Sequence, residues 1–262
     1  MDEQKIIING LEINYKNFGD GDRGSVLILH GWGRGADSWI RFGRFLASKG
    51  YRVIVPDLPG FGKSQAPDVA WAVADYLKFV ENFVAELGLG KMYLIGHSFG
   101  GGLAAVFAAH NQETILKLVF VDAAVIRKER LNLRQQAAKT LAAGKSLFMR
   151  FPFADKLRPF AEKMVYRIAG NHDYEKTTGA MRETFKNILG EDLSSAVGFL
   201  KKPVLIIWGS ADRSTPVQDA HQLKHKITGS LLEVIDNCGH NPHLTHPAEL
   251  CRMVDAFLGA RN

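Results

Sequence analysis

Three residues far apart in the chain, Ser98, Asp212 and His240, carry the side chains that nucleophilic catalysis requires. A serine hydroxyl is a poor nucleophile until a base takes its proton, and that base must itself be oriented. Histidine can act as the base, and a carboxylate can hold the imidazole ring in one tautomer. The three residue types together predict a serine hydroxyl that is activated as a nucleophile.

The surroundings of Ser98 carry the clearest signal. It lies in the middle of Gly96-His97-Ser98-Phe99-Gly100, a G-x-S-x-G pattern between a short apolar strand and a helix of small residues. Gly96 and Gly100 lack the Cβ atoms that would clash where the backbone reverses sharply. The alternative is a glycine-rich helix start that happens to contain serine. The strand, turn and helix together favour an exposed nucleophilic hydroxyl at Ser98.

Asp212 and His240 each follow a predicted strand. Residues 204–208 form a short apolar run that leads to Asp212, and residues 231–235 precede His240. Parallel strands present their carboxyl ends at one edge of a sheet, where ligands bind. We therefore expect Ser98, Asp212 and His240 to converge at that edge.

The wider chain alternates strand and helix patterns. Apolar runs predict strands at residues 25–30, 51–57, 91–97, 118–122, 204–208 and 231–235. Amphipathic patterns predict helices at about 39–49, 70–87, 216–226 and 247–258, and a helix continues after Ser98 through 103–110. This alternation predicts a mostly parallel sheet with crossover helices. Asn9-Gly10 lies between two β-rich runs and predicts a hairpin that adds one antiparallel strand.

One interval breaks the alternation. Residues 125–196 show no convincing strand, only helical patterns such as 130–143 and 159–168. So long a segment is not expected to be a structureless loop within a compact domain. We expect residues 1–124 and 197–262 to form the core domain and residues 125–196 an inserted helical cap. Aromatic residues between Phe148 and Tyr166 would give the pocket an apolar roof.

With these motifs in order, the chain resembles the α/β-hydrolase family. His30-Gly31-Trp32-Gly33 resembles the family's H-G-x-G oxyanion loop, and residues 57–64 are similar to its D-x-P-G-x-G-x-S signature. The nucleophile, acid and base also follow the family's order in the chain. The resemblance implies an α/β fold: an eight-stranded, mostly parallel sheet flanked by helices, with the cap inserted.

The resemblance also implies a role for each residue. Ser98 would attack the carbonyl carbon, His240 would act as base and then acid, and Asp212 would orient the imidazole. Backbone N–H groups of Trp32 and Phe99 would form the oxyanion hole. Asp122 is an alternative acid, because it ends the strand before the cap and some family members place the acid there. We favour Asp212, whose position before His240 is the usual one. No cofactor is implied.

Other signals are weaker. Gly60-Phe61-Gly62-Lys63-Ser64 resembles the end of a phosphate-binding loop, but Asp57 occupies the position of the required glycine. His240, His243 and His246 suggest a metal cluster, yet prolines interrupt the run and no cysteine or carboxylate set completes it. We expect neither nucleotide nor metal binding.

Composition bounds the remaining possibilities. The 262 residues carry 33 Lys and Arg against 27 Asp and Glu, and the excess basic residues are dispersed at helix-like intervals around the cap, which favours a solvated surface over a nucleic-acid patch. Two cysteines cannot make a disulfide framework. With no signal-peptide pattern and no long apolar run, we expect a cytoplasmic protein without a membrane segment.

The expected function is hydrolysis of carboxylic esters of small to medium apolar acids through an acyl-enzyme. One alternative is a carbon–carbon bond hydrolase of ring-cleavage diketones, which would use the same triad and need a polar group to hold a substrate carboxylate. Another is a slow or non-catalytic ligand-binding sensor of the same fold. Substrate identity and oligomeric state do not follow from the sequence.

Overall fold

Eight strands form one sheet in a computed structural model of the chain, which describes residues 1–126 and 177–260. The strands are β1 (Asp2–Ile8), β2 (Leu11–Phe18), β3 (Ser25–Leu29), β4 (Arg52–Pro56), β5 (Met92–His97), β6 (Ile115–Val121), β7 (Val204–Gly209) and β8 (Leu231–Ile235). Their spatial order is β1-β2-β4-β3-β5-β6-β7-β8. The expected eight-stranded sheet is confirmed.

The pairing of the strands is mostly parallel. Every pair from β4 to β8 is parallel, whereas β2 is antiparallel to both β1 and β4. The β1–β2 hairpin turns at Asn9 and Gly10, whose φ angles are 53° and 81°. Two positive φ angles in succession define the hairpin turn that Asn-Gly favours. The predicted hairpin and its single antiparallel strand are therefore confirmed.

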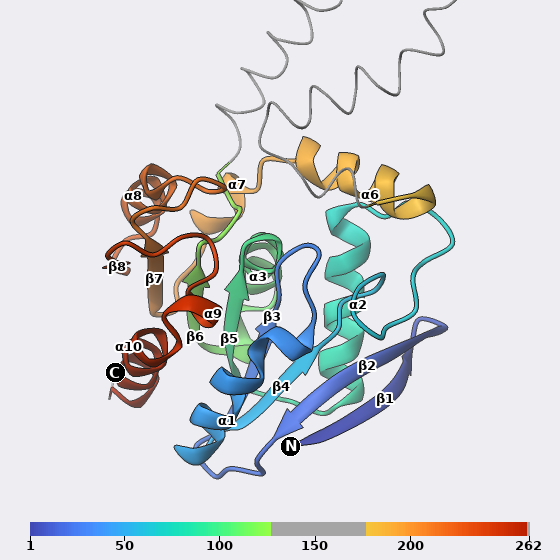
Figure 1. The fold of residues 1–262 in the computed structure, drawn as a ribbon, viewed down its shortest axis with the longest axis horizontal. Helices are drawn as coiled ribbons and strands as arrows, with labels where there is room; N and C mark the ends of the chain where they lie inside the picture. Colours follow the sequence, from blue (N-terminus) through green and yellow to red (C-terminus); the bar gives the residue numbers. More distant parts are fainter. Residues whose placement is uncertain (127–176, 261–262) are drawn as a thin grey trace, which may run out of the picture.

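Helices cover both faces of the sheet (Figure 1). Side chains of α2 (Val73–Glu86), α3 (Phe99–His110) and α8 (Val217–Lys226) join one buried cluster, and those of α1 (Ile40–Ser48) and α10 (Pro247–Gly259) join the other. Along β3, Leu27 and Leu29 belong to the first cluster and Val26 and Ile28 to the second. The strands read as continuous apolar runs because alternate side chains enter two separate cores.

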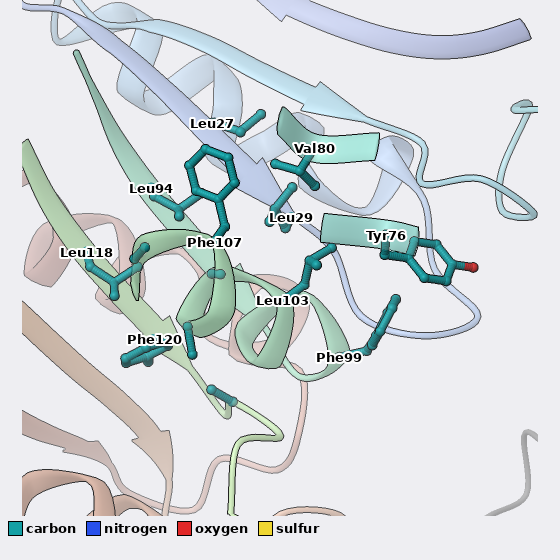
Figure 2. Packing of buried hydrophobic residues seen from close by; sticks show 14 of the residues in the cluster. Leu27, Leu29, Tyr76, Val80, Leu94, Phe99, Leu103, Phe107, Leu118 and Phe120 are labelled. Carbon is teal, nitrogen blue, oxygen red and sulfur yellow. The ribbon is translucent and has the colours of Figure 1, made fainter. Parts of the chain in front are cut away.

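The helix that follows Ser98 is buried along most of its length. Figure 2 shows Phe99, Leu103 and Phe107 of α3 among Leu27 and Leu29 of β3, Leu94 of β5 and Tyr76 of α2. Nine of its twelve residues are buried, including three consecutive glycines. A helix that is apolar all round is a central helix. Because α3 begins at Phe99, its buried position also fixes the position of the neighbouring Ser98.

The remaining helices are short or lie near the carboxyl ends of the strands. They are η1 (Ala36–Trp39), η2 (Gln112–Thr114), α6 (Gly179–Gly190), α7 (Ser194–Val197) and α9 (Pro242–Thr245). The predicted helices at 130–143 and 159–168 and the aromatic residues of the expected roof lie outside the described residues. In the described part of the chain, no helix is long and apolar enough to cross a membrane.

Candidate active site

Ser98 lies on a strained turn between β5 and α3. Its φ and ψ angles are 52° and −118°, a backbone conformation that residues with a side chain rarely adopt. A Cβ on Gly96 would lie 2.5 Å from the carbonyl oxygen of Gly100, and a Cβ on Gly100 would lie 2.2 Å from that of Leu29. Glycine is therefore required at both positions for strand and helix to approach this closely.

Hydrogen bonds of the Ser98 backbone hold the turn in place. The Ser98 N–H donates to the carbonyl of Val121 at 3.1 Å, and the Ser98 carbonyl accepts from Gly102 at 3.1 Å and from Ala124 at 2.8 Å. These bonds tie the turn to the end of β6 and stabilise its strained geometry. The result is a half-exposed hydroxyl on a rigid support.

The structure brings Ser98, His240 and Asp212 together in one hydrogen-bonded row. Nε2 of His240 lies 2.8 Å from Oγ of Ser98, and Nδ1 lies 2.7 Å from Oδ2 of Asp212. With a proton on Nδ1, the ring donates to the carboxylate and its Nε2 can accept the serine proton. The sequence separates Ser98 from His240 by 142 positions, and the parallel strand ends bring them into contact.

The side chain of Asp212 is held by hydrogen bonds from Ser214 and Thr215, in the turn that follows it. Its Oδ1 accepts the N–H groups of Ser214 at 2.7 Å and Thr215 at 3.0 Å, and its Oδ2 accepts the Thr215 hydroxyl at 2.6 Å. Burial alone would raise the pKa of Asp212, but the hydrogen bonds from His240 and Thr215 outweigh it and hold the pKa below its ordinary value. Asp212 is therefore an ionised carboxylate, as an orienting acid must be.

Asp122, the alternative acid, lies beside Asp212 rather than in the row. Its Oδ1 accepts the Gly209 N–H at 2.9 Å, and its Oδ2 has no hydrogen-bond partner assigned within the described residues. Burial, followed by the nearby charge of Asp212, raises the pKa of Asp122 to about 8. In the structure, Asp212 and not Asp122 accepts the hydrogen bond from His240 Nδ1.

Two further histidines lie behind His240. Nε2 of His97 lies 2.8 Å from the His240 carbonyl oxygen, to which it donates, and the His243 ring packs against His97 and stacks on Trp39 at 4.4 Å. Burial holds the pKa of His97 well below its ordinary value and lowers that of His243 to about 3. Both rings are therefore neutral, and His97 supports the backbone at His240.

The helix start and the loop that contain the expected oxyanion donors lie next to Ser98. Phe99 is the first residue of α3, so its N–H has no acceptor within the helix and the positive end of the helix dipole lies beside it. Gly31, which precedes Trp32, approaches the elbow so closely that a Cβ there would lie 2.8 Å from His97 Nδ1 and 3.1 Å from the Ser98 Cβ. The Trp32 loop therefore runs directly against Ser98.

Polar contacts of His30 and Asp57 fix that loop. His30 Nδ1 donates to the Gly31 carbonyl at 2.8 Å, and its Nε2 accepts the Leu58 N–H at 2.9 Å. Asp57 accepts the N–H groups of Ala36 and Lys63 at 2.6 and 3.0 Å. The 57–64 motif thus serves the shape of the site, and we assign it no part in phosphate binding.

Four aromatic rings line this side of the site. The partly exposed Trp32 contacts Phe61, Phe99 and Phe185 at ring-centroid distances of 4.7, 5.7 and 4.9 Å. We call Trp32, Phe61, Phe99 and Phe185 the aromatic wall. Phe185 belongs to α6, so its contact with Trp32 attaches this helix to the Trp32 loop. Phe61, Phe99 and Phe185 are buried, so the partly exposed Trp32 presents most of the wall's accessible apolar surface.

A possible metal group differs from the one considered in the sequence. His97, Asp122 and His240 offer ligand atoms within 4.8 Å of one another, whereas His243 is buried against Trp39. Both ring nitrogens of His240 already contact Ser98 and Asp212. A metal ion held there would have to break one of these hydrogen bonds, so the donor set does not fit a resident metal.

These observations define a hydrolase-type fold, and sequence comparison identifies its family. Residues 24–247 match the model of the alpha/beta hydrolase fold family, so the chain belongs to the α/β-hydrolases. Membership of this family supports the assignment of the chain as a hydrolase.

Relatives of the chain differ in their reactions. It is 29% identical over 272 residues to a 2-hydroxy-6-oxononadienedioate/2-hydroxy-6-oxononatrienedioate hydrolase of Burkholderia vietnamiensis, covering 95% of this chain and 91% of that protein. A membrane phospholipase A is similar in structure with a TM-score of 0.74 and 26% identity, covering 98% and 85% of the two chains. An esterase from Exiguobacterium antarcticum has a TM-score of 0.76 with 21% identity over 99% and 100% of the chains, and it shows the shared fold.

Sequence reasoning missed two residues of the site. Thr215 contacts Asp212 through both its N–H and its hydroxyl, and the pattern Asp212-Arg213-Ser214-Thr215 is typical of a turn capped by an aspartate side chain. Phe185 lies in the expected cap, and no periodic signal connects it with Trp32. Thr215 could have been found from turn chemistry, whereas Phe185 can be found only from the tertiary structure.

Proposed function

We propose that this protein is a serine hydrolase that cleaves carboxylic esters of small to medium apolar acids. The observation that carries the proposal is the row Ser98–His240–Asp212, with hydrogen bonds of 2.8 and 2.7 Å. Ser98 attacks the ester carbonyl as His240 takes its proton, and His240 returns that proton to the leaving alcohol. Water activated by His240 then releases the acid from the acyl-enzyme.

The oxyanion and the acyl group of the substrate are proposed to bind in two different parts of the site. The N–H groups of Trp32 and Phe99 stabilise the developing negative charge, at about 3–4 kcal/mol for one such donor in other enzymes. The aromatic wall supports a preference for apolar acyl groups, because Trp32 is partly exposed beside the elbow. We further propose that residues 125–196 form the cap over this site and that the enzyme works in the cytoplasm, without a cofactor, nucleic acid or membrane.

The decisive experiment is turnover of p-nitrophenyl acetate and butyrate by the wild type and Ser98→Ala. Removing the nucleophile should reduce kcat to the level left by binding and the oxyanion site alone. A fluorophosphonate probe should label the wild type at Ser98 and leave Ser98→Ala unlabelled. A wild type no faster than Ser98→Ala on a broad ester and diketone panel would reject the enzyme and favour a ligand-binding sensor.

A second candidate is hydrolysis of a carbon–carbon bond in ring-cleavage diketones. The observation that favours it is the 29% identity to the 2-hydroxy-6-oxononadienedioate/2-hydroxy-6-oxononatrienedioate hydrolase over nearly the whole chain. The two reactions are separated by comparing kcat/KM for p-nitrophenyl butyrate and for a 2-hydroxy-6-oxo-dienoate on the same preparation. A higher value for the dienoate would replace the ester proposal.

A further inference from the structure

His97 connects two parts of the candidate site that lie far apart in the sequence. It is the last residue of β5 and directly precedes Ser98. Its Nε2 lies 2.8 Å from the carbonyl oxygen of His240, 143 positions further along the chain. The backbone of His97 therefore leads into the expected nucleophile, while its side chain holds the backbone of the expected base.

The contacts of the His97 ring determine its tautomer. A carbonyl oxygen only accepts hydrogen bonds, so Nε2 must carry the proton that it donates to His240. The other ring nitrogen, Nδ1, is buried and has no hydrogen-bond partner within the described residues. A proton on Nδ1 would be a buried donor without an acceptor, which is unfavourable. The ring is therefore a neutral imidazole whose single proton lies on Nε2.

Packing holds the ring in this orientation. The His97 side chain is buried, and Gly31 approaches it so closely that a Cβ on Gly31 would lie 2.8 Å from Nδ1. The ring of His243 contacts that of His97 at a centroid distance of 4.6 Å and is itself stacked on Trp39. A ring packed in this way has little freedom to turn its Nε2 away from the carbonyl group.

The same ring also contacts the residues that follow His240. His243 belongs to α9, only three positions after His240. His97 thus holds this segment twice, through the hydrogen bond to the His240 carbonyl and through the ring contact with His243. The position of the His240 backbone relative to the end of β5 is therefore set by one side chain.

We propose that His97 is a positioning residue that sets the distance between Ser98 Oγ and His240 Nε2 by holding the His240 carbonyl group. This inference rests on the proposed Ser-His-Asp function. Proton transfer from Ser98 needs His240 Nε2 within hydrogen-bond distance, which is 2.8 Å in this structure. Ser98 is fixed by its own backbone hydrogen bonds, so a shift of the His240 backbone would lengthen this contact directly.

His97→Gln and His97→Met form a matched pair of variants. Both new side chains are unbranched and similar in length, but only glutamine has an N–H that can donate to the His240 carbonyl group. His97→Met should reduce kcat on p-nitrophenyl butyrate about 2- to 10-fold through loss of this hydrogen bond. KM should change little, because the His97 side chain is buried. His97→Gln should recover most of the wild-type kcat.

His225→Met is the control, because it makes the same substitution at an exposed histidine of α8, and it should match the wild type. An equal loss of kcat in His97→Gln and His97→Met would show that packing of the ring matters rather than its hydrogen bond, and would overturn the proposal. A folded His97→Met variant with the wild-type kcat would overturn it as well.

Nuclear magnetic resonance of 15N-labelled protein tests the role without any need for turnover or for a folded methionine variant. In the wild type, the His97 ring should carry its proton on Nε2, and this proton should exchange slowly with water because it is buried and hydrogen-bonded. A proton on Nδ1, or an Nε2 proton that exchanges rapidly, would refute the hydrogen bond to His240.

The Nδ1 proton of His240, which is donated to Asp212, reports the position of the expected base. Its resonance should shift in His97→Met and return toward the wild-type value in His97→Gln. An unchanged resonance in a folded His97→Met variant would refute the positioning role. If the wild type hydrolyses neither esters nor diketones, the proposed function fails, and these resonances alone decide whether His97 positions His240.

Discussion

Removal of the Thr215 hydroxyl should slow hydrolysis while leaving the fold intact. This hydroxyl has one proton, and its nearest acceptor is Oδ2 of Asp212 at 2.6 Å, against 3.2 Å for the Asp122 carbonyl. Thr215→Val keeps a branched side chain and the N–H bond to Oδ1 of Asp212 at 3.0 Å. The variant thus removes one hydrogen bond to the carboxylate that orients His240.

The magnitude follows from the charge on the acceptor. A hydrogen bond to a charged group contributes about 1.5–3 kcal/mol. If this stabilisation is lost where His240 becomes positively charged, kcat/KM should fall about 10- to 100-fold. The pKa of Asp212 should also rise, because Thr215 is one of the donors that hold it down. The acid limb of the pH profile should therefore move to higher pH.

Thr215→Ser is the matched control, because it keeps the hydroxyl and removes only the methyl group. Steady-state kinetics on p-nitrophenyl butyrate should show Thr215→Ser close to the wild type and Thr215→Val slow, with both variants folded in a thermal melt. Equal kcat/KM for Thr215→Val and the wild type would refute the reasoning. So would an equal loss in the serine variant, which would point to packing rather than the hydrogen bond.

Two further predictions concern stability. Gly100→Ala places a Cβ 2.2 Å from the Leu29 carbonyl oxygen, so the backbone must move. Urea denaturation should show that the free energy of unfolding falls by about 1–3 kcal/mol or more. Gly190→Ala is the control and should remain close to the wild type, because its added Cβ meets nothing within 4 Å. A stable Gly100→Ala would contradict the close approach of α3 and β3. Glu3 contacts Lys63 and Lys16, which lower its pKa from 4.5 to about 2, so its stabilisation is fully present above pH 4.5 and is lost as the pH falls toward 2. Thermal melts should show the difference between wild type and Glu3→Gln shrinking over this range, and a constant difference would disprove the assignment.

The sheet could be predicted from the sequence because its strands are continuous apolar runs. Residues such as Val26 and Leu27 enter different cores, so the parallel strands stand out without alternation. Asn9-Gly10 predicted the hairpin through local turn chemistry. Element ends were less certain: the helix predicted at 70–87 spans Val73–Glu86, and the short α9 (Pro242–Thr245) was not predicted.

The site was predictable where chemistry follows a strand directly. Ser98, Asp212 and His240 each come just after a strand, and the sheet topology brings them together. The full burial of the Asp122 carboxyl group could not be predicted, because it depends on how the ends of β6 and β7 pack together. The contact of Phe185 with Trp32 likewise depends on the packing of α6. The catalytic roles of these residues remain predictions that the variants above will test.

Because 142 positions separate Ser98 from His240, the site can form only when the chain between them has folded. A chain cut between them contains Ser98 without His240, and a chain whose sheet has formed only as far as β6 contains the turn at Ser98 alone. Contacts between distant parts of a sequence form slowly during folding. In a refolding experiment, recovery of hydrolysis should therefore lag behind recovery of helical circular dichroism, and fragments released during synthesis or degradation should be unable to hydrolyse esters.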